Sequence, residues 1–480
     1  MYNDNKTDVL GKVKGSFTSR KFRSGAYVTI MSAIVIVIVL VINMLISKMN
    51  IEIDLSTQNM YTLTKDTKDM IKDLEDDITI YYLVQTGAEN DILTNIIKQY
   101  EANSQKVNVV HKDPILYPKF ASTYVDDEVI EHSFIVVNNT KNRAKYVDYN
   151  DLLIQEINYQ TYTQETTAID VEGQLTAAIQ YVTNPNLPKM YVLEGHGEMT
   201  TTETFRTTMA KMNVNMQTLS TLSQGNIPED CDFLYINAPQ GDLSDAETTM
   251  IKDYLASGGK AIITLDYYAQ GLKNFQSILE YYGIEIVDGI VLEGDAGKHF
   301  SNYMNYIIPT VKSHEITSRA FSNAIPLFMP DSVGLKISET KRSSLSIEPL
   351  LTTSNFSFSR VNTSSTSIEK EEGDIDGPFN LGLVSTDTFN GVTSSIIVFS
   401  SSYTFGDETM SYSNPDLLTG TIGYMVGDTD LLSIPTKSLA VSTVSVSQRT
   451  VVMIGIAVIA VIPGIILLTG ILVTLKRRKR

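Results

Sequence analysis

The stretch FLYINAPQGDLSDAETTMIKDYLASGGKAIITL, residues 233–265, decides the fold that this sequence predicts. Short apolar strands at 233–237 and 261–265 enclose a helix that opens with the capping box Ser244-Asp245-Ala246-Glu247 and stops at Gly258-Gly259. In a capping box, the serine hydroxyl and the glutamate carboxylate satisfy backbone N–H groups that the first helical turn leaves free. Short apolar strands that alternate with helices are typical of a parallel sheet covered by helices on both faces.

The same alternation continues on both sides of this stretch. It predicts a doubly wound α/β domain over residues 189–430. Residues of about 292–378, rich in Ser, Thr and Asn and including the acidic segment 370–376, lack this regularity and indicate an irregular or β-rich insertion that is partly mobile. The other predicted strands are 189–193, 215–219, 284–287, 380–385 and 395–400, and the other predicted helices are 202–212 and 275–282.

Residues 49–188 predict a separate α/β domain. A strand, a helix and a second strand form a βαβ unit, and a hairpin and a final helix follow it. This order is that of a thioredoxin-like domain, but the chain has a single cysteine, so we expect the scaffold without the redox chemistry. The strands are 78–84, 107–111, 134–137 and 144–147, and the helices are 65–74, 91–102 and 171–182.

Two apolar runs without charged side chains, residues 26–46 and 451–475, stand near the two ends of the chain. A helix needs about 20 apolar residues to cross the hydrocarbon core of a bilayer, so both runs predict membrane-spanning helices. The basic tails 1–25 and 476–480 predict that both termini are cytoplasmic and the middle is extracytoplasmic. We therefore expect a two-pass cell-membrane protein that contacts the lipid bilayer, with a polar connector at 431–450.

Each apolar run has a second interpretation. The first run could be a cleaved signal peptide, but it is longer than the apolar core of such peptides and no Ala-x-Ala site follows it, which favours an uncleaved anchor. In the second run, Pro463-Gly464 fits a tolerated kink and a packing point for a partner helix equally well.

The charge balance argues against one class of partner. The chain carries a formal charge of −17 although both tails are basic, so its middle is strongly acidic. Nucleic-acid binding needs a basic surface, so we predict that the protein does not bind nucleic acid.

The turn Glu194-Gly195-His196-Gly197-Glu198 is the strongest candidate site. It follows a predicted strand of the α/β sheet, where ligands bind at carboxyl ends. A histidine between two carboxylates could hold a metal or transfer protons, but no second histidine stands at metal-ligand spacing. The competing interpretation is a glycine-enabled turn with exposed polar side chains. We therefore assign these five residues to ligand or partner binding, and predict no catalytic residue, metal or cofactor.

The single cysteine, Cys231, is a poor nucleophile candidate. It precedes a strand and lies among carboxylates, which raise the pKa of a thiol, so a structural role is favoured. The sequence also lacks a Gly-x-Ser-x-Gly elbow, a Walker-A loop and a Gly-x-Gly-x-x-Gly loop.

Several motifs, taken in order, resemble the GldG family, whose members are gliding-motility-type auxiliary components of ABC transport systems. The similarity extends over nearly the whole chain except 292–378, and it lies in the order and spacing of the motifs more than in any one of them. The motifs are Tyr61-Thr62-Leu63-Thr64 with Thr67, Leu175-Thr176-Ala177-Ala178-Ile179, KMYVLEGHGE at 189–198, Leu243-Ser244-Asp245-Ala246-Glu247 and Leu255-Ala256-Ser257-Gly258-Gly259-Lys260.

The resemblance implies a membrane-anchored, non-catalytic auxiliary subunit that acts with an ABC ATPase and an ABC-2 type permease. It implies a flavodoxin-like, glutamine-amidotransferase-like fold for 189–430, but without the cysteine elbow of those enzymes. The extracytoplasmic domains would bind the substrate or a cell-envelope partner. Two alternatives are a membrane-tethered hydrolase or amidase that uses His196 with Glu194 or Glu198, and a structural protein that links membrane and wall.

Overall fold

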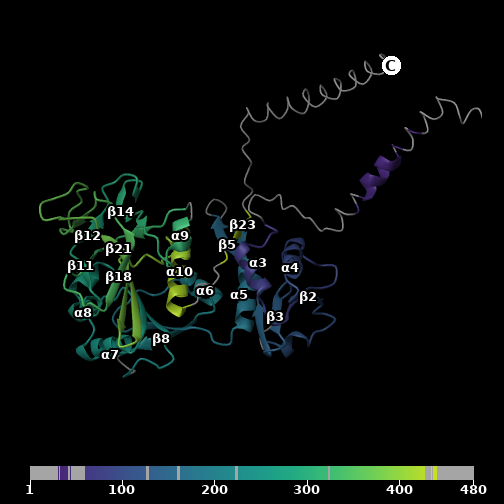
Figure 1. Ribbon diagram of the computed structural model, residues 1–480, viewed down its shortest axis with the longest axis horizontal. Coiled ribbons are helices and arrows are strands. Elements are labelled where there is room, and N and C mark those ends of the chain that lie inside the picture. The colour runs from purple at the N-terminus through teal and green to yellow at the C-terminus, as the bar shows by residue number, and fades with distance from the viewer. Residues whose placement is uncertain are drawn as a thin grey trace, which may run out of the picture. The chain divides into compact units, whose positions relative to one another are not determined.

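The structure, a computed structural model, describes residues 60–427 except 126–128, 159–162, 222–224 and 323–324, together with 434, 436–439 and, nearer the amino end, 27, 31, 33–41 and 44. Its internal contacts divide the chain into two units, residues 1–60 and 61–480. In the first unit, residues 33–41 are helical. All elements named below belong to the second unit (Figure 1).

The largest sheet is built from β7 (Lys189–Glu194), β8 (Asn215–Ser220), β9 (Phe233–Asn237), β10 (Lys260–Thr264), β11 (Ile284–Val287), β15 (Thr310–Val311), β17 (Gly334–Ile337), β18 (Leu345–Thr352), β21 (Asn380–Phe389) and β22 (Val392–Phe399). Strands β8-β7-β9-β10-β22 are neighbours in that order, and each neighbouring pair is parallel. The first of these strands along the chain, β7, thus lies between the second and the third, as in flavodoxin-like sheets. Antiparallel strands β21, β17 and β11 extend the row beyond β22.

Helices cover both faces of this sheet because successive strand residues point to opposite sides. In β9, Phe233 and Tyr235 belong to the core under α6, α9 and α10, whereas Leu234 and Ile236 belong to the core under α7 and α8 (Figure 1). The predicted capping box is present at the start of α7. The bounds are α6 (Glu203–Lys211), α7 (Asp245–Ala256), η3 (Tyr267–Gly271), α8 (Lys273–Tyr281), α9 (Ser318–Ser322) and α10 (Asn414–Val426).

A smaller sheet in the amino-terminal part has the order β2-β1-β3-β4. Strands β1 and β2 are parallel and are joined by α4, and β3 and β4 are antiparallel to their neighbours. Helix α5 packs on β3 and β4. The bounds are α3 (Lys65–Lys72), β1 (Ile78–Leu83), α4 (Asp91–Asn103), β2 (Val107–Lys112), η1 (Ala121–Thr123), β3 (Phe134–Asn138), β4 (Arg143–Val147) and α5 (Val171–Thr183).

A third sheet brings the carboxyl-terminal part of the chain back to the amino-terminal part. Its strand order is β23-β6-β5. The bounds are β5 (Leu153–Asn158), β6 (Thr163–Ile169) and β23 (Lys437–Ser438), and the short helix η2 (Tyr149–Leu152) comes directly before β5. Strand β23 pairs antiparallel with the end of β6. It comes from the segment 431–450 that the sequence predicts as a connector, most of which lies outside the described residues.

The insertion that the sequence predicts at about 292–378 contains short strands. One group pairs in the order β12-β19-β20, and another in the order β13-β14-β16. Strands β15, β17 and β18 of the large sheet also come from this part of the chain. The bounds are β12 (Ile290–Leu292), β13 (His299–Phe300), β14 (Tyr303–Ile307), β16 (Met329–Pro330), β19 (Phe358–Arg360) and β20 (Ile375–Asp376).

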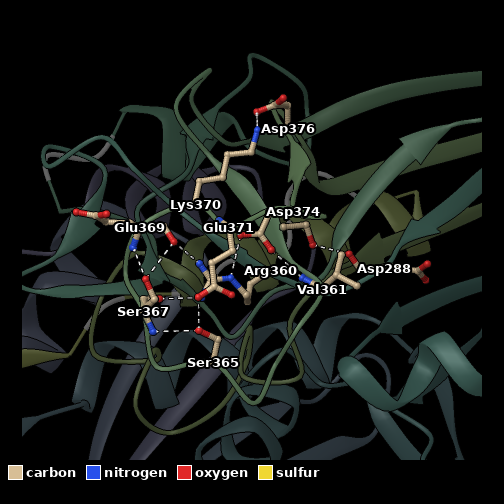
Figure 2. A network of polar contacts seen from close by, with 11 residues as sticks. Asp288, Arg360, Val361, Ser365, Ser367, Glu369, Lys370, Glu371, Asp374 and Asp376 are labelled. Carbon is tan, nitrogen blue, oxygen red and sulfur yellow. Dashed lines mark hydrogen bonds and ion pairs between the residues drawn. The ribbon is translucent and has the colours of Figure 1, made fainter.

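The acidic segment of the insertion folds around one buried arginine (Figure 2). Arg360, 3% exposed, donates from Nε to Asp374 at 2.9 Å. Its two other nitrogens donate to the carbonyl oxygens of Ser367 at 2.8 Å and Glu369 at 2.5 Å. Asp374 also accepts the backbone N–H of Glu371 at 2.8 Å. Burial opposes ionisation of Asp374, but these hydrogen bonds outweigh burial and lower the pKa of its carboxyl.

The predicted fold class with two flanking membrane spans is corrected by the structure, and so is the predicted two-pass localisation. Among the described residues the longest helices, α4, α5 and α10, have 13 residues each, and no described helix is long and apolar enough to cross a membrane. A span needs about 20 apolar residues in one helix. The described part is a mixed α/β fold. Segment 451–475, the tails 1–25 and 476–480, and the positions of 26–46 other than 27, 31, 33–41 and 44 lie outside the described residues.

Candidate functional site at the strand ends

The turn proposed above as the binding site lies at the carboxyl end of β7. The chain passes from β7 to β8 on one side and then returns to β9 on the other, so the strand order reverses at this point. In open α/β sheets a ligand crevice forms at such a reversal, outside the carboxyl ends of the strands. The turn therefore occupies the position where this fold offers a site.

Two glycines give the turn its path. The φ angles of Gly195 and Gly197 are 126° and 71°, which side chains with a Cβ rarely adopt. The path brings the carbonyl oxygen of His196 to the loop after β9, where it accepts the N–H groups of Gln240 at 3.0 Å and Gly241 at 2.7 Å. These two hydrogen bonds fix the turn against that loop.

The side chain of His196 is buried between two carboxylates. Its Nδ1 lies 3.2 Å from Glu198 Oε1, and its Nε2 lies 3.2 Å from Glu247 Oε1. The three side chains are only 5–6% exposed. Nδ1 forms a hydrogen bond with Glu198, whereas Nε2 forms none despite its short distance to Glu247. Both ring nitrogens face protein groups instead of open solvent.

The two carboxylates are held by further hydrogen bonds. Glu198 accepts the backbone N–H of His196 at 2.8 Å. Glu247, the acid of the capping box, accepts the N–H and hydroxyl of Ser244 at 2.9 and 2.7 Å and the hydroxyl of Thr221 at 2.6 Å. Burial works against the charged form of Glu247, but the hydrogen bonds from Thr221 and Ser244 and the nearby His196 outweigh it and lower the pKa of this carboxyl to about 2.

A cavity of about 700 Å³ opens beside the turn. Its lining includes Gly195, Gly197 and Glu198 but not His196. Glu194, the last residue of β7, is exposed and also lines it. The floor is apolar and the rim is polar; the further lining residues are Val192, Leu193, Met199, Thr200, Thr201, Arg206, Ala210, Val214, Met216, Gln217 and Thr218.

One wall of this cavity, residues 199–201, is tied to the end of β9. Asn237 O accepts the N–H of Met199 at 2.9 Å, and Asn237 Nδ2 donates to Met199 O at 2.6 Å. The next residue, Ala238, is buried and has a φ of 47°, a conformation that residues other than glycine seldom adopt. These hydrogen bonds hold the segment that follows β7 against the end of β9.

The arrangement suits binding better than chemistry on the histidine. Its ring is enclosed, and among the residues that the structure describes no cluster of three or more His, Cys, Asp or Glu side chains could hold a metal ion. The structure brings His196 and Glu198 together, while Glu194 stays outside their contact.

Two residues of the site are absent from the sequence prediction. Asn237 ends an apolar strand, and a polar residue at the carboxyl end of a parallel strand is a signal that could have been used. Glu247 is predicted as a helix cap, but nothing in the sequence indicates that it also meets His196.

Cys231 lies away from this site, just before the amino end of β9. Its Sγ donates to the hydroxyl of Tyr254 at 3.5 Å. Burial raises the pKa of the thiol to about 11, and the neighbouring carboxylates Asp232 and Asp230 add to this.

Comparison with known families gives two matches. The family model described as "ABC-type uncharacterized transport system" matches residues 187–432, just over half of the chain. A second model, described as a domain of unknown function (DUF7088), matches residues 57–155. No curated protein matches the chain.

Three solved structures are similar in part. The mmIFT52 N-terminal domain matches at 17% identity and a TM-score of 0.38, over 49% of this chain and 97% of that one. A putative GMP synthase component from Thermoplasma acidophilum matches at 10% identity and a TM-score of 0.28, over 51% and 96%. PurLQS from Thermotoga maritima matches at 8% identity and a TM-score of 0.25, over 50% and 100%. TM-scores this low support no argument about function.

Proposed function

We propose that this chain, which belongs to the family described as ABC-type uncharacterized transport system, is a non-catalytic auxiliary component of an ABC-type transporter. The membership confirms the resemblance to transport auxiliary proteins at the level of that family, which does not name GldG. The finer proposal is that the chain assembles with an ATPase and a permease. The sequence has no nucleotide-binding motif, so the energy for transport must come from another chain.

The observation that carries the non-catalytic part of the proposal is the burial of His196 between Glu198 and Glu247. A general base or nucleophile must reach the reacting group within hydrogen-bond distance. The ring of His196 is 5% exposed and does not line the neighbouring cavity. Its contacts instead hold the turn in place, and the turn forms part of the cavity. We assign this cavity to binding of the transported substrate or of a partner segment.

The assembly is tested by affinity purification of the full tagged chain, co-expressed with any ABC ATPase and ABC-2 type permease that the neighbouring genes encode. We expect both proteins to be retained and the purified chain alone to hydrolyse no ATP. Recovery of the chain without either partner under mild conditions would contradict the proposed assembly.

The non-catalytic role is tested with His196→Gln, and His111→Gln at an exposed position serves as the matched control. Both variants and the parent chain are assayed against a panel of amide and ester substrates and for partner retention. We expect no turnover by any of the three, and weaker partner retention by His196→Gln alone. Turnover by the parent chain that disappears in a folded His196→Gln variant would establish the hydrolase instead.

A further inference from the structure

A second cavity, of about 170 Å³, shares the wall 199–201 with the first. It lies between that wall and the loop that follows β22, at the carboxyl ends of the parallel strands. Its volume is more than ten times the roughly 10–15 Å³ that a single water molecule needs. The lining residues are Met199, Thr200, Thr201, Thr202, Phe205, Tyr235, Asn237, Ser402, Tyr403, Phe405, Gly406, Asp407 and Glu408.

The loop after β22 is held in a fixed shape by its own hydrogen bonds. The hydroxyl of Thr404 donates to Ser401 O at 2.6 Å, and the hydroxyl of Thr409 donates to Tyr403 O at 2.7 Å. The N–H of Tyr403 also donates to the hydroxyl of Ser401 at 3.1 Å. The part of this loop that lines the cavity is therefore preorganised.

Aromatic rings form the floor of the cavity. Phe205 and Tyr235 stack with ring centroids 5.1 Å apart, and Phe405 lies 6.3 Å from Phe205. These three side chains are 2–4% exposed. A ring presents its negative face or edge-bound hydrogens to a ligand, and cations within about 6 Å of an aromatic centroid are attracted by it.

Two carboxylates stand at the rim. Asp407 and Glu408 are exposed, and neither side chain forms an ion pair or hydrogen bond with any residue that the structure describes. The lining contains no Lys, Arg or His. The lining therefore carries two negative charges without a lining cation. Arg206 donates to the wall residue Thr201 from outside the lining, but its own ion pair is with Glu203.

The remaining polar groups of the cavity do not favour an anion. The hydroxyl of Tyr235 donates to Asn237 Oδ1 at 3.0 Å, so that hydroxyl proton is already used. The amino end of α6 reaches the cavity through Thr202, but a helix end is equivalent to only about half a positive charge. Two full carboxylate charges outweigh it.

We propose that this cavity binds a small organic ammonium ion, with the aromatic floor receiving its alkyl part and Asp407 and Glu408 its charge. A bare metal ion does not fit this lining, because the described residues contain no cluster of metal-ligating side chains. This proposal does not depend on the assembly proposed above. It names the class of ligand that the cavity at the strand ends would bind.

The test is isothermal calorimetry on the full chain with choline, and with 3,3-dimethylbutan-1-ol as the neutral molecule of the same shape. We expect choline to bind and the alcohol to bind at least about tenfold more weakly, because only choline carries the charge that the carboxylates and rings recognise. No binding of choline, or equal binding of the alcohol, would overturn the proposal.

The carboxylates are tested with Asp407→Asn/Glu408→Gln, which removes both charges while keeping the shape of the rim. Glu339→Gln/Glu372→Gln removes two exposed carboxylates elsewhere and is the matched control. Choline affinity should fall at least about tenfold in the first variant and stay unchanged in the second. Retained affinity in a folded rim variant, or an equal loss in the control, would show that the site is not the one proposed.

Discussion

Lys437 Nζ lies 2.9 Å from a carboxylate oxygen of Glu172, in an ion pair whose side chains are only 9% and 2% exposed. The other oxygen of Glu172 accepts the N–H and hydroxyl of Thr64, the N-cap of α3, at 2.6 and 2.8 Å. Lys437 also donates to Thr62 O at 2.7 Å. One buried carboxylate on α5 thus joins α3 and β23, the first and last described elements of the second unit.

Glu172→Gln should destabilise the folded chain by on the order of 3–5 kcal/mol, because it removes the carboxylate of a buried ion pair with Lys437. Lys437→Met should cost a similar amount, and the double variant should cost less than the sum, since both changes remove the same pair. Urea unfolding measures these differences. The control is Asp77→Asn, whose pair with Lys106 is exposed and should contribute below about 1 kcal/mol. An equal loss in the control would show that burial of the pair is not what matters.

Arg360→Met should release residues 361–376, which include the acidic segment 370–376. The substitution leaves Asp374 buried without its cation and frees the carbonyl oxygens that the guanidinium binds. We expect proteolytic cleavage within this segment and faster hydrogen exchange there. Lys370→Met is the control, because its pair with Asp376 is exposed. A cleavage pattern identical to that of the parent chain would refute this role of Arg360.

Stability should fall as pH decreases from about 4.5 to about 2, in part because of Glu247, since the pKa of its carboxyl is lowered from 4.5 to about 2 in the folded chain. A depressed carboxyl pKa stabilises the fold above the unfolded value and loses this contribution as the carboxylate is protonated. Glu247→Gln should therefore lower the free energy of unfolding at pH 7 and flatten its slope below pH 4.5. Glu339→Gln, at an exposed position, should keep the parent slope. Identical slopes for all three proteins would contradict the assignment.

Cys231 should react slowly with iodoacetamide at pH 7.5. Burial raises the pKa of its thiol from 9.0 to about 11, so the thiolate fraction falls about a hundredfold. The chain has one cysteine, so the measured rate belongs to this residue alone. Unfolding in urea should restore the rate of an unperturbed thiol. A folded rate equal to the unfolded rate would mean that the thiol is not shielded.

The regular part of the fold follows from local patterns. Short apolar strands such as KMYVL and FLYIN identify β7 and β9, and the serine and glutamate of the capping box place the start of α7 within one residue. By contrast, β23 has two residues and no periodicity. Its pairing with β6 joins segments far apart in the chain, and no local pattern encodes such a pairing. Residues 33–41 of the first apolar run are helical, but no described helix is long and apolar enough to cross a membrane.

The candidate site, like the fold, could be predicted only in part from the sequence. Glycine spacing after a strand locates the turn, because Gly195 and Gly197 adopt φ values that other residues avoid. The sequence leaves open whether His196 is exposed or enclosed. The approach of Glu247 from α7 decides this, and that approach depends on how the helix packs on the sheet.

By itself, the sequence determined the regular strands and helices of the two α/β regions, such as β7, β9 and α7, and which turn stands at the end of β7. Hydrogen bonds within a few residues and the period of apolar side chains decide such features. Only the tertiary structure decided that His196 is enclosed, that Arg360 organises an acidic segment and that Lys437 meets Glu172. Burial and ion pairing depend on which distant segments come together, and the free energy of a charge is set by the groups that surround it in the folded chain.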